Sequence, residues 1–254
     1  LAYTICNRYF IALTVYVDND KKKPSYKNKY IGLDFGIQTT ITTSNGDKYD
    51  VQVEETDRLK RLQTILNRKV KWSNNWKKTR SLIRKEYTHI SNIKDDTARK
   101  IVHKLINENE MVIFQDDPIN TWNKEEHKGQ IQHSILGRVK DLLLHKDNVV
   151  VDNVVVLDKY YPTSKYCFDC GTKNDNLTLK DRIFVCPNCG HIEDRDVHAA
   201  KNMVQIYLNY INIKTDTVGT TDTDKKPLEI KYDNSLLWSK FESTKENTGS
   251  LALC

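Results

Sequence analysis

The chain has 254 residues, 38% hydrophobic and 29% charged, and its 40 Lys and Arg against 34 Asp and Glu give a formal net charge of +6. This length suggests one large domain or a domain with an appendage, and the apolar fraction is too high for a wholly disordered chain. No run approaches the ~18 apolar residues of a membrane helix, so we expect no membrane partner. The chain begins at Leu1 rather than Met and shows no secretory signal, which suggests the C-terminal part of a longer protein.

Strands dominate the predicted structure of the first 53 residues. A polar turn from Asp18 to Ser25 follows the first strand, and the hairpin signal Asn45-Gly46 separates the last two. The last three strands are expected to run antiparallel in sequence. The predicted strands are 9–17, 29–36, 39–43 and 48–53.

From residue 54 onward, the apolar residues recur with the period of a helix. Apolar residues recur at spacings of three and four from Leu59 to Val70, which predicts an amphipathic helix. The remaining elements are predicted as helices at 97–108, 131–145 and 196–211, and strands at 111–114 and 149–158. Together they suggest a mixed five-stranded α/β sheet in the order of an RNase H-like fold, although periodicity alone does not exclude other α/β folds.

Four of the six cysteines lie within one short window, and Cys6 and Cys254 lie near the ends. The four form two CxxC turns separated by fifteen residues, a spacing typical of zinc sites rather than of a disulfide framework. Two such turns complete a tetrahedron of thiolates around Zn²⁺, with no open position for catalysis. A pair of redox dithiols is the alternative. The predicted zinc ligands are Cys167, Cys170, Cys186 and Cys189.

Two carboxylates lie at the edges of predicted elements. Asp34 ends an apolar strand, with Gly32 and Gly36 on either side, and Asp196 lies where the last helix begins. Mg²⁺ prefers a few carboxylates together with waters and phosphates, so the two acids are candidate ligands. Taken singly, Asp34 also fits a turn former, and Asp196 fits a helix N-cap or first-turn acid.

The order of these motifs resembles a known family. GLDFG at 32–36, MVIFQDDPINTW at 111–122, the two CxxC turns and DRDVHAAKNM at 194–203 are similar to the C-terminal half of the TnpB (OrfB) proteins, over roughly residues 9 to 211. These are transposon-associated, RNA-guided DNA endonucleases, similar to miniature type V CRISPR effectors. The resemblance implies a RuvC nuclease domain of RNase H fold with an inserted zinc ribbon, and guide RNA and target DNA as partners.

The resemblance also implies roles for individual residues. Asp34 matches the first catalytic acid and Asp196 the third, and the four cysteines match the ribbon ligands. Many relatives have Glu where this chain has Gln115, but a subset with QDE before a Trp places the second acid on Asp117. Strand parity also puts Gln115 and Asp117 on one face, with Asp116 on the other. Two Mg²⁺ ions held by Asp34, Asp117 and Asp196 would then hydrolyse a phosphodiester.

This chain departs from the family's motifs at two positions, and both bear on the predicted cleavage. Asp117 is one methylene shorter than the Glu of that subset, and His198 stands where the family usually has Asn. Two alternatives therefore stay open. One is an RNA-guided DNA-binding protein with impaired cleavage, acting as a repressor or a transposon accessory. The other is a zinc-ribbon nucleic-acid-binding protein that uses no guide RNA.

A basic segment at 60–85 is the candidate wall against nucleic acid. Aromatic side chains among cations stack on bases, although a solvated helix face and buried tryptophans are the simpler alternatives. In the family this region lies against the guide–target duplex. The candidate residues are Arg61, Arg68, Lys69, Lys71, Trp72, Trp76 and, outside the segment, Arg195.

The resemblance finally predicts a division of the chain. Missing N-terminal recognition and wedge regions of the same protein, a homodimer, and a cytoplasmic location with action at the nucleoid are further expectations. The expected parts are 1–27 as the end of a wedge-type β domain, 28–160 as the RuvC core with a helical insertion, 161–193 as the zinc ribbon, 194–215 as the final RuvC helix and 216–254 as a loosely structured tail.

Overall fold

The computed structural model describes residues 2–5, 8–11, 26–119, 122, 128–144, 153–178, 180–216 and 228–231. A mixed, mostly parallel sheet lies at the centre of this part, in the strand order β10-β7-β6-β3-β4-β5. Parallel pairing joins β3, β6, β7 and β10, whereas β3, β4 and β5 pair antiparallel as predicted. The strands are β3 (Asn28–Phe35), β4 (Ile41–Thr43), β5 (Lys48–Tyr49), β6 (Asn109–Gln115), β7 (Val154–Leu157) and β10 (Leu228–Ile230).

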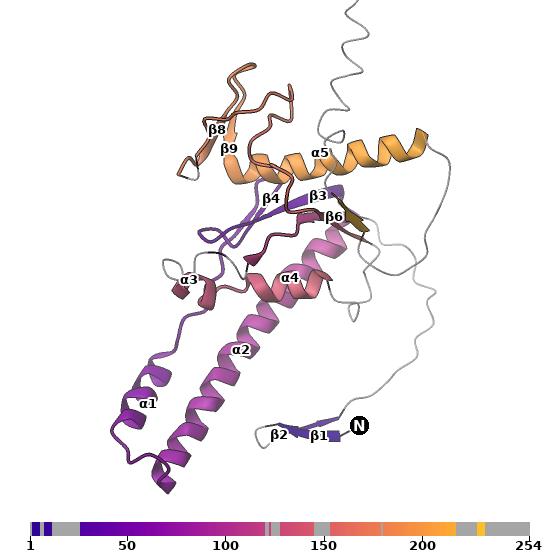
Figure 1. Ribbon diagram of the computed structural model, residues 1–254. Coiled ribbons are helices and arrows are strands. Elements are labelled where there is room, and N and C mark those ends of the chain that lie inside the picture. The colour runs from indigo at the N-terminus through magenta and orange to yellow at the C-terminus, as the bar shows by residue number, and fades with distance from the viewer. Residues whose placement is uncertain are drawn as a thin grey trace, which may run out of the picture.

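Helices cover both faces of the sheet. Helix α5 (Arg195–Asp216) lies across one face, and α2 (Asn74–Glu108) and α4 (Leu136–Leu144) lie on the other (Figure 1). Each central strand alternates between two apolar cores, as a strand buried on both sides must. On β3, Leu33 packs toward α2 and α4, whereas β6 presents Ile113 to the core beneath α5.

A single glycine sets how closely α5 approaches the sheet. A Cβ atom on Gly32 would lie 2.0 Å from the carbonyl oxygen of Ala200 on α5. No side chain fits there, so the glycine of the GLDFG motif is required by packing. Asp34, two residues along β3, points to the same face, and Asp196 lies about one helical turn before Ala200. The close contact therefore brings the first turn of α5 to the end of β3.

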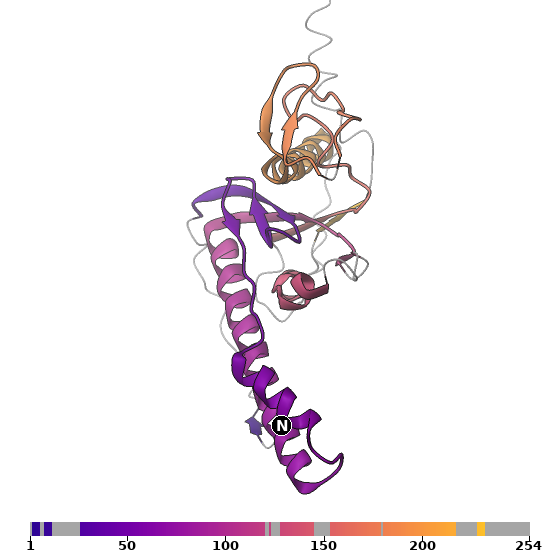
Figure 2. The same cartoon turned by 90° about the vertical axis from the view of Figure 1, so that its left-hand side faces the viewer.

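Helices α1 (Asp57–Asn67) and α2 form a hairpin that extends away from the sheet (Figure 2). The outer half of α2 packs on α1 through Ile83 and Ile90 against Leu59. Its inner half packs on the sheet. The helix predicted at 97–108 is thus the end of one 35-residue helix, whose sequence holds no Gly or Pro to interrupt it.

Several predicted boundaries differ from the structure. The helix predicted at 131–145 is divided into α3 (Lys128–His133) and α4, because the Ser134 hydroxyl accepts the Leu136 amide and starts a new helix. The predicted five-stranded sheet has a sixth strand, β10, in the part of the tail expected to be loose. The strand predicted at 9–17 overlaps β2 (Arg8–Ile11), which pairs with β1 (Ala2–Ile5); residues 12–25 lie outside the described residues.

The first CxxC turn precedes a small separate hairpin, and the second CxxC turn connects its two strands. The hairpin consists of β8 (Ile183–Val185) and β9 (Ile192–Asp194), and β9 leads directly into α5. None of the helices in the described part of the chain is both long and apolar enough to cross a bilayer.

Candidate functional site: an acidic cleft beside a thiolate cluster

An open cleft of about 540 Å³ lies where the carboxyl ends of β3 and β6 meet the start of α5. Asp34, Asp117 and Asp196 all line it. The carboxyl edge of parallel strands is where α/β proteins commonly bind ligands. The cations Lys159, Lys165 and Arg195 also line the cleft, so it holds side chains of both charges.

Two of the three carboxyls have a raised pKa, Asp34 and Asp117. Burial is the largest cause that holds the pKa of Asp34 well above its usual range, and the charges of Asp196 and Asp117 raise it further, while Arg195 opposes them. Burial also raises the pKa of Asp117 to about 6, against the opposing charge of Lys140. Like charges that converge in a buried place favour either protons or a bound cation.

Asp116 points away from this group. Its carboxylate lies 2.7 Å from the ammonium of Lys140 on α4, which also donates to the backbone carbonyl of Asp117 at 2.6 Å. Asp116 does not line the cleft, whereas Asp117 does. The two neighbouring acids therefore have different surroundings, and only the second faces Asp34 and Asp196.

Gln115 is fully engaged in holding the backbone. Its amide nitrogen donates to the carbonyls of Asp158 (3.1 Å) and Tyr161 (2.7 Å), and its amide oxygen accepts from the Thr163 hydroxyl at 3.1 Å. A carboxylate could not donate these two bonds. Gln115 thus fixes the segment after β7 that forms the far wall of the cleft.

Asp196 lies in the first turn of α5 but does not cap it. The Asp194 carboxylate accepts the amides of Asp196 (3.0 Å) and Val197 (3.2 Å), so Asp194 is the cap. The Lys48 ammonium on β5 holds the other oxygen of Asp194 at 2.7 Å. Asp196 is left to face the cleft, with Arg195 at 3.3 Å from its carboxylate. Sequence analysis missed Asp194, although the acid two residues before Asp196 was the available signal.

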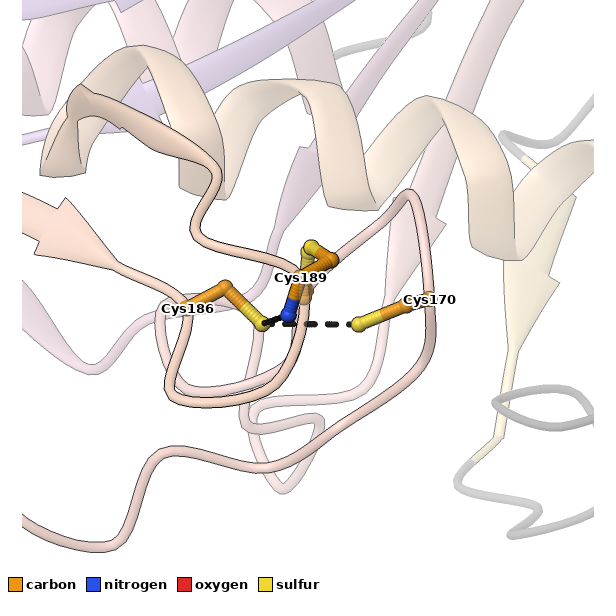
Figure 3. A group of neighbouring side chains, drawn as sticks. Cys170, Cys186 and Cys189 are labelled. Atoms are coloured by element: carbon orange, nitrogen blue, oxygen red, sulfur yellow. Dashed lines mark hydrogen bonds between the residues drawn. The ribbon is translucent and has the colours of Figure 1, made fainter.

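The four predicted zinc ligands lie together. Cys167 and Cys189 have sulfur atoms 3.6 Å apart, and those of Cys170 and Cys186 are 3.4 Å apart. All four sulfurs lie within 4.8 Å of one another, near the roughly 3.8 Å spacing that 2.3 Å Zn–S bonds impose on a tetrahedron. Figure 3 shows Cys170 facing Cys186, with Cys189 beside them. The donor set fits Zn²⁺.

Glycine completes both turns. Gly171 and Gly190 follow the second cysteine of each turn, with φ of 72° and 73°. Each amide donates to the carbonyl of the first cysteine of its turn, at 2.7 Å and 3.2 Å. The two turns therefore share one backbone geometry.

The tip of the α1–α2 hairpin carries aromatic and basic side chains. Trp72 is 62% exposed and lies 5.1 Å from Trp76, ring centre to ring centre. Lys71 lies over Trp72 at 5.8 Å, and Arg80 over Trp76 at 5.3 Å. A buried core position is thus excluded for Trp72.

The other basic candidates are not equivalent to one another. The Lys69 ammonium bonds the Thr79 hydroxyl (2.6 Å) and the Asn75 carbonyl (3.3 Å), so it closes the hairpin turn. Arg61 and Arg68 are exposed along α1 and its end. Arg195 lies in the cleft and not on the hairpin.

Comparison with known proteins gives the family. A family model described as "Probable transposase" (OrfB) matches residues 13–116, and another described as "Cas12f1-like, TNB domain" matches residues 137–203. A "Putative RNA-guided DNA endonuclease" of Streptomyces pristinaespiralis is 32% identical over 178 residues, covering 68% of this chain and 44% of the relative. InsQ of Escherichia coli (strain K12), with the same description, is 25% identical over 219 residues, covering 78% and 54%.

The fold and its clusters define an α/β protein with an acidic cleft next to a Cys₄ cluster. With the family models and these relatives, they show that the chain belongs to the TnpB (OrfB) family. The chain spans about half the length of these two relatives. A solved Cas12f1–sgRNA–target DNA complex is 17% identical with a TM-score of 0.40, covering 72% of this chain and 50% of that one.

Proposed function

We propose that this chain is the nuclease part of an RNA-guided DNA endonuclease. In this proposal, residues 28–160 and 194–215 form a RuvC core of RNase H-like fold, and residues 161–193 form a structural zinc ribbon. The observation that carries it is the cleft lined by Asp34, Asp117 and Asp196, three acids from distant segments. The names of the relatives supply the reaction: cleavage of DNA under the guidance of RNA.

The three carboxylates fit Mg²⁺. They are oxygen donors with raised proton affinity at Asp34 and Asp117, so the site gains stability when a cation replaces the protons. A pair of bound Mg²⁺ ions would activate the attacking water and stabilise the leaving oxygen. The chain's own acids would hold the ions and orient the phosphate, while Asp194 and Gln115 fix the segments that carry Asp196 and the far wall.

The DNA backbone would enter between positive side chains. Lys159, Lys165 and Arg195 line the cleft and offset the charge of the acids toward phosphate. The α1–α2 hairpin offers a second basic surface, with Trp72 exposed at its tip, for the duplex of guide RNA and target DNA. Such a duplex is bound through its shape and backbone, while base pairing reads the sequence.

Gln115 favours a second candidate function, RNA-guided DNA binding with little cleavage. The family resemblance implies Glu at that position in many members, whereas here the Gln115 amide is consumed by backbone bonds. The second acid is then Asp117 alone, with a shorter side chain. A misplacement of ~1 Å costs on the order of 100-fold in rate.

Cleavage of labelled target DNA by the RNA-loaded protein separates the two functions. We expect cutting with Mg²⁺ and none with EDTA, and a loss on the order of 100-fold or more for Asp34→Ala, Asp117→Ala and Asp196→Ala. Asp116→Ala is the matched control, because that acid lies outside the cleft, and it should keep most activity.

Binding is measured on the same variants. Equal target binding by the wild type and Asp34→Ala, with cutting by neither, would reject the nuclease and leave the binding protein. In that case Asp117→Glu, which restores the missing methylene, should raise cleavage if shortened reach is the cause.

A further inference from the structure

A second group of potential metal ligands lies beside the zinc ribbon, away from the acidic cleft. His191 follows the second CxxC turn, Glu193 lies on β9 and His198 lies on α5. One ligand atom from each lies within 4.8 Å of the others. The His198 side chain is fully buried, and those of His191 and Glu193 are 22% and 17% exposed.

Three polar atoms at the centre of this group lack hydrogen-bond partners in the described part of the chain. They are Nε2 of His191, Oε2 of Glu193 and Nδ1 of His198. Oε2 lies 3.5 Å from the His191 nitrogen and 3.7 Å from the His198 nitrogen. Buried polar atoms without partners are rare and costly, so three that converge call for an explanation.

In each histidine ring, one nitrogen faces the group (the inner nitrogen) and the other faces away from it (the outer nitrogen). The hydrogen-bond partner of the outer nitrogen determines whether the inner nitrogen carries a proton or a lone pair. Nδ1 of His191 lies 2.9 Å from the Asp169 carboxylate, and Nε2 of His198 lies 2.7 Å from the Tyr166 carbonyl. Both outer partners only accept hydrogen bonds, so each outer nitrogen carries the proton. In the neutral rings the inner nitrogens then present lone pairs to one another and to a carboxylate oxygen. Three lone pairs facing one point are the arrangement that a cation stabilises.

Metal-binding histidines are commonly supported in this way. Their second N–H donates to a carboxylate or a backbone carbonyl, which orients the ring and increases its basicity. Asp169 and the Tyr166 carbonyl provide one partner of each kind. Phe184 stacks on the His198 ring at 3.8 Å and 12°, and Phe168 meets the His191 ring edge-on at 4.8 Å. The rings are therefore held in place before any ion binds.

The remaining carboxylate oxygen has another partner. Lys201 pairs with Oε1 of Glu193, which leaves Oε2 directed at the histidines. Ligand atoms ~2.1 Å from a tetrahedral zinc ion lie roughly 3.4 Å apart, close to the spacings seen here. Nitrogen and carboxylate donors in this combination suit Zn²⁺.

We propose that His191, Glu193 and His198 form a second zinc site, with a water in the fourth position. The ion would join the second CxxC turn and β9 to the first turn of α5, and so hold the ribbon against the helix that carries Asp196. None of the three ligands lines the acidic cleft, and the His198 side chain is fully buried, so the proposed role is structural. The inference stands apart from the proposed function, because it concerns metal content and not cleavage.

Zinc content measured on the purified protein tests the site. After saturation with Zn²⁺ and removal of excess ion, we expect two equivalents per chain, and one for His198→Asn, the residue that relatives resembling this chain usually carry there. His89→Asn, on the exposed face of α2, is the matched control and should keep two. His191→Asn repeats the test at a less buried position, should His198→Asn fail to fold by circular dichroism.

Cobalt distinguishes the two sites. Co²⁺ in the thiolate cluster gives sulfur-to-metal charge transfer, whereas a second equivalent at nitrogen and oxygen ligands should add only weak visible bands. A single equivalent in the wild type, or two equivalents retained by both His198→Asn and His191→Asn, would overturn the proposal. The first result would instead favour a protonated His191 that donates to Glu193.

Discussion

The acidic cleft and the thiolate cluster differ in their donor atoms, in the sequence separation of their residues and in their openness to solvent. The cleft gathers oxygen donors from positions 34, 117 and 196 in an open space, whereas the cluster takes four sulfurs from positions 167 to 189 and closes around them. Hard cations such as Mg²⁺ keep several water ligands and exchange with ions in solution. Zinc in a closed Cys₄ site has only protein ligands and stays bound. The difference agrees with the proposal that the cleft serves the reaction and the thiolate cluster serves folding.

Chelation of zinc should give the largest difference between the two regions. Structural zinc contributes about 10–16 kcal/mol to the folding of small metal domains, and the Cys₄ ribbon has only a small core around Phe184. We expect a strong zinc chelator to expose the amides of 165–194 to hydrogen exchange while the central strands stay protected. Removal of Mg²⁺ should leave both regions protected. Uniform exchange after zinc loss would show that the sheet depends on the ribbon.

Substitution at Gly32 should damage the cleft without touching a ligand. In Gly32→Ala the new Cβ would meet the Ala200 carbonyl at 2.0 Å, so α5 must move away from β3. Overpacking of this kind costs about 1–3 kcal/mol or more, and the shift would separate Asp34 from Asp196. The temperature of thermal unfolding and the rate of cleavage should both be lower than in the wild type.

Gly137→Ala is the control for this prediction. Nothing lies within 4 Å of a Cβ at that position in α4, and Ala favours a helix by about 1 kcal/mol over Gly. It should unfold at the same temperature as the wild type or higher. Equal effects at both glycines would contradict the packing account of GLDFG.

The same contrast explains what the sequence could predict. The thiolate cluster is local, so spacing alone located all four cysteines. The cleft depends on pairing between segments far apart in the chain. Period and parity predicted the central strands and put Asp117 on the face of Gln115, but they carried no sign of the Lys140 contact that draws Asp116 away.

Other features were beyond the reach of local patterns. Strand β10 has three residues and pairs with β7, a contact that only the assembled sheet creates. The group at His191, Glu193 and His198 went unnoticed because only His198 was considered, as a departure from Asn. Two histidines and a glutamate within eight residues were the available signal.

Removal of the Asp117 charge should separate stability from metal binding. A carboxyl whose folded pKa is raised to about 6 favours the protonated form, so its contribution to stability is present below pH ~4 and lost as pH rises through 6. Asp117→Asn should therefore stabilise the metal-free protein by roughly 1–3 kcal/mol at pH 7.5, with no gain at pH 4. Denaturant unfolding at both pH values measures this.

Addition of Mg²⁺ should make the wild type more stable than Asp117→Asn. An ion bound to the wild type stabilises it by mass action, and Asp117→Asn should gain less. Asp116→Asn is the control: it loses an ion pair with Lys140 whose carboxylate is 59% exposed, and it should change stability by less than about 1 kcal/mol at either pH. A stabilising effect of Asp117→Asn that Mg²⁺ leaves unchanged would argue against a cation at this acid.

The smallest effect on stability is expected at the tip of the hairpin. Trp72 is exposed and has a φ of 71°, a left-handed backbone that a bulky residue adopts only at some cost. Trp72→Gly should relieve that strain and leave stability equal or higher, while loss of one stacking platform weakens nucleic-acid binding by about 1–3 kcal/mol. Val70→Ala is the control, because Val70 is 78% exposed near the same turn but has no aromatic face. Equal affinity of the wild type and Trp72→Gly for guide–target duplex would assign the tryptophan to the turn alone, and the hairpin surface would then act through its cations.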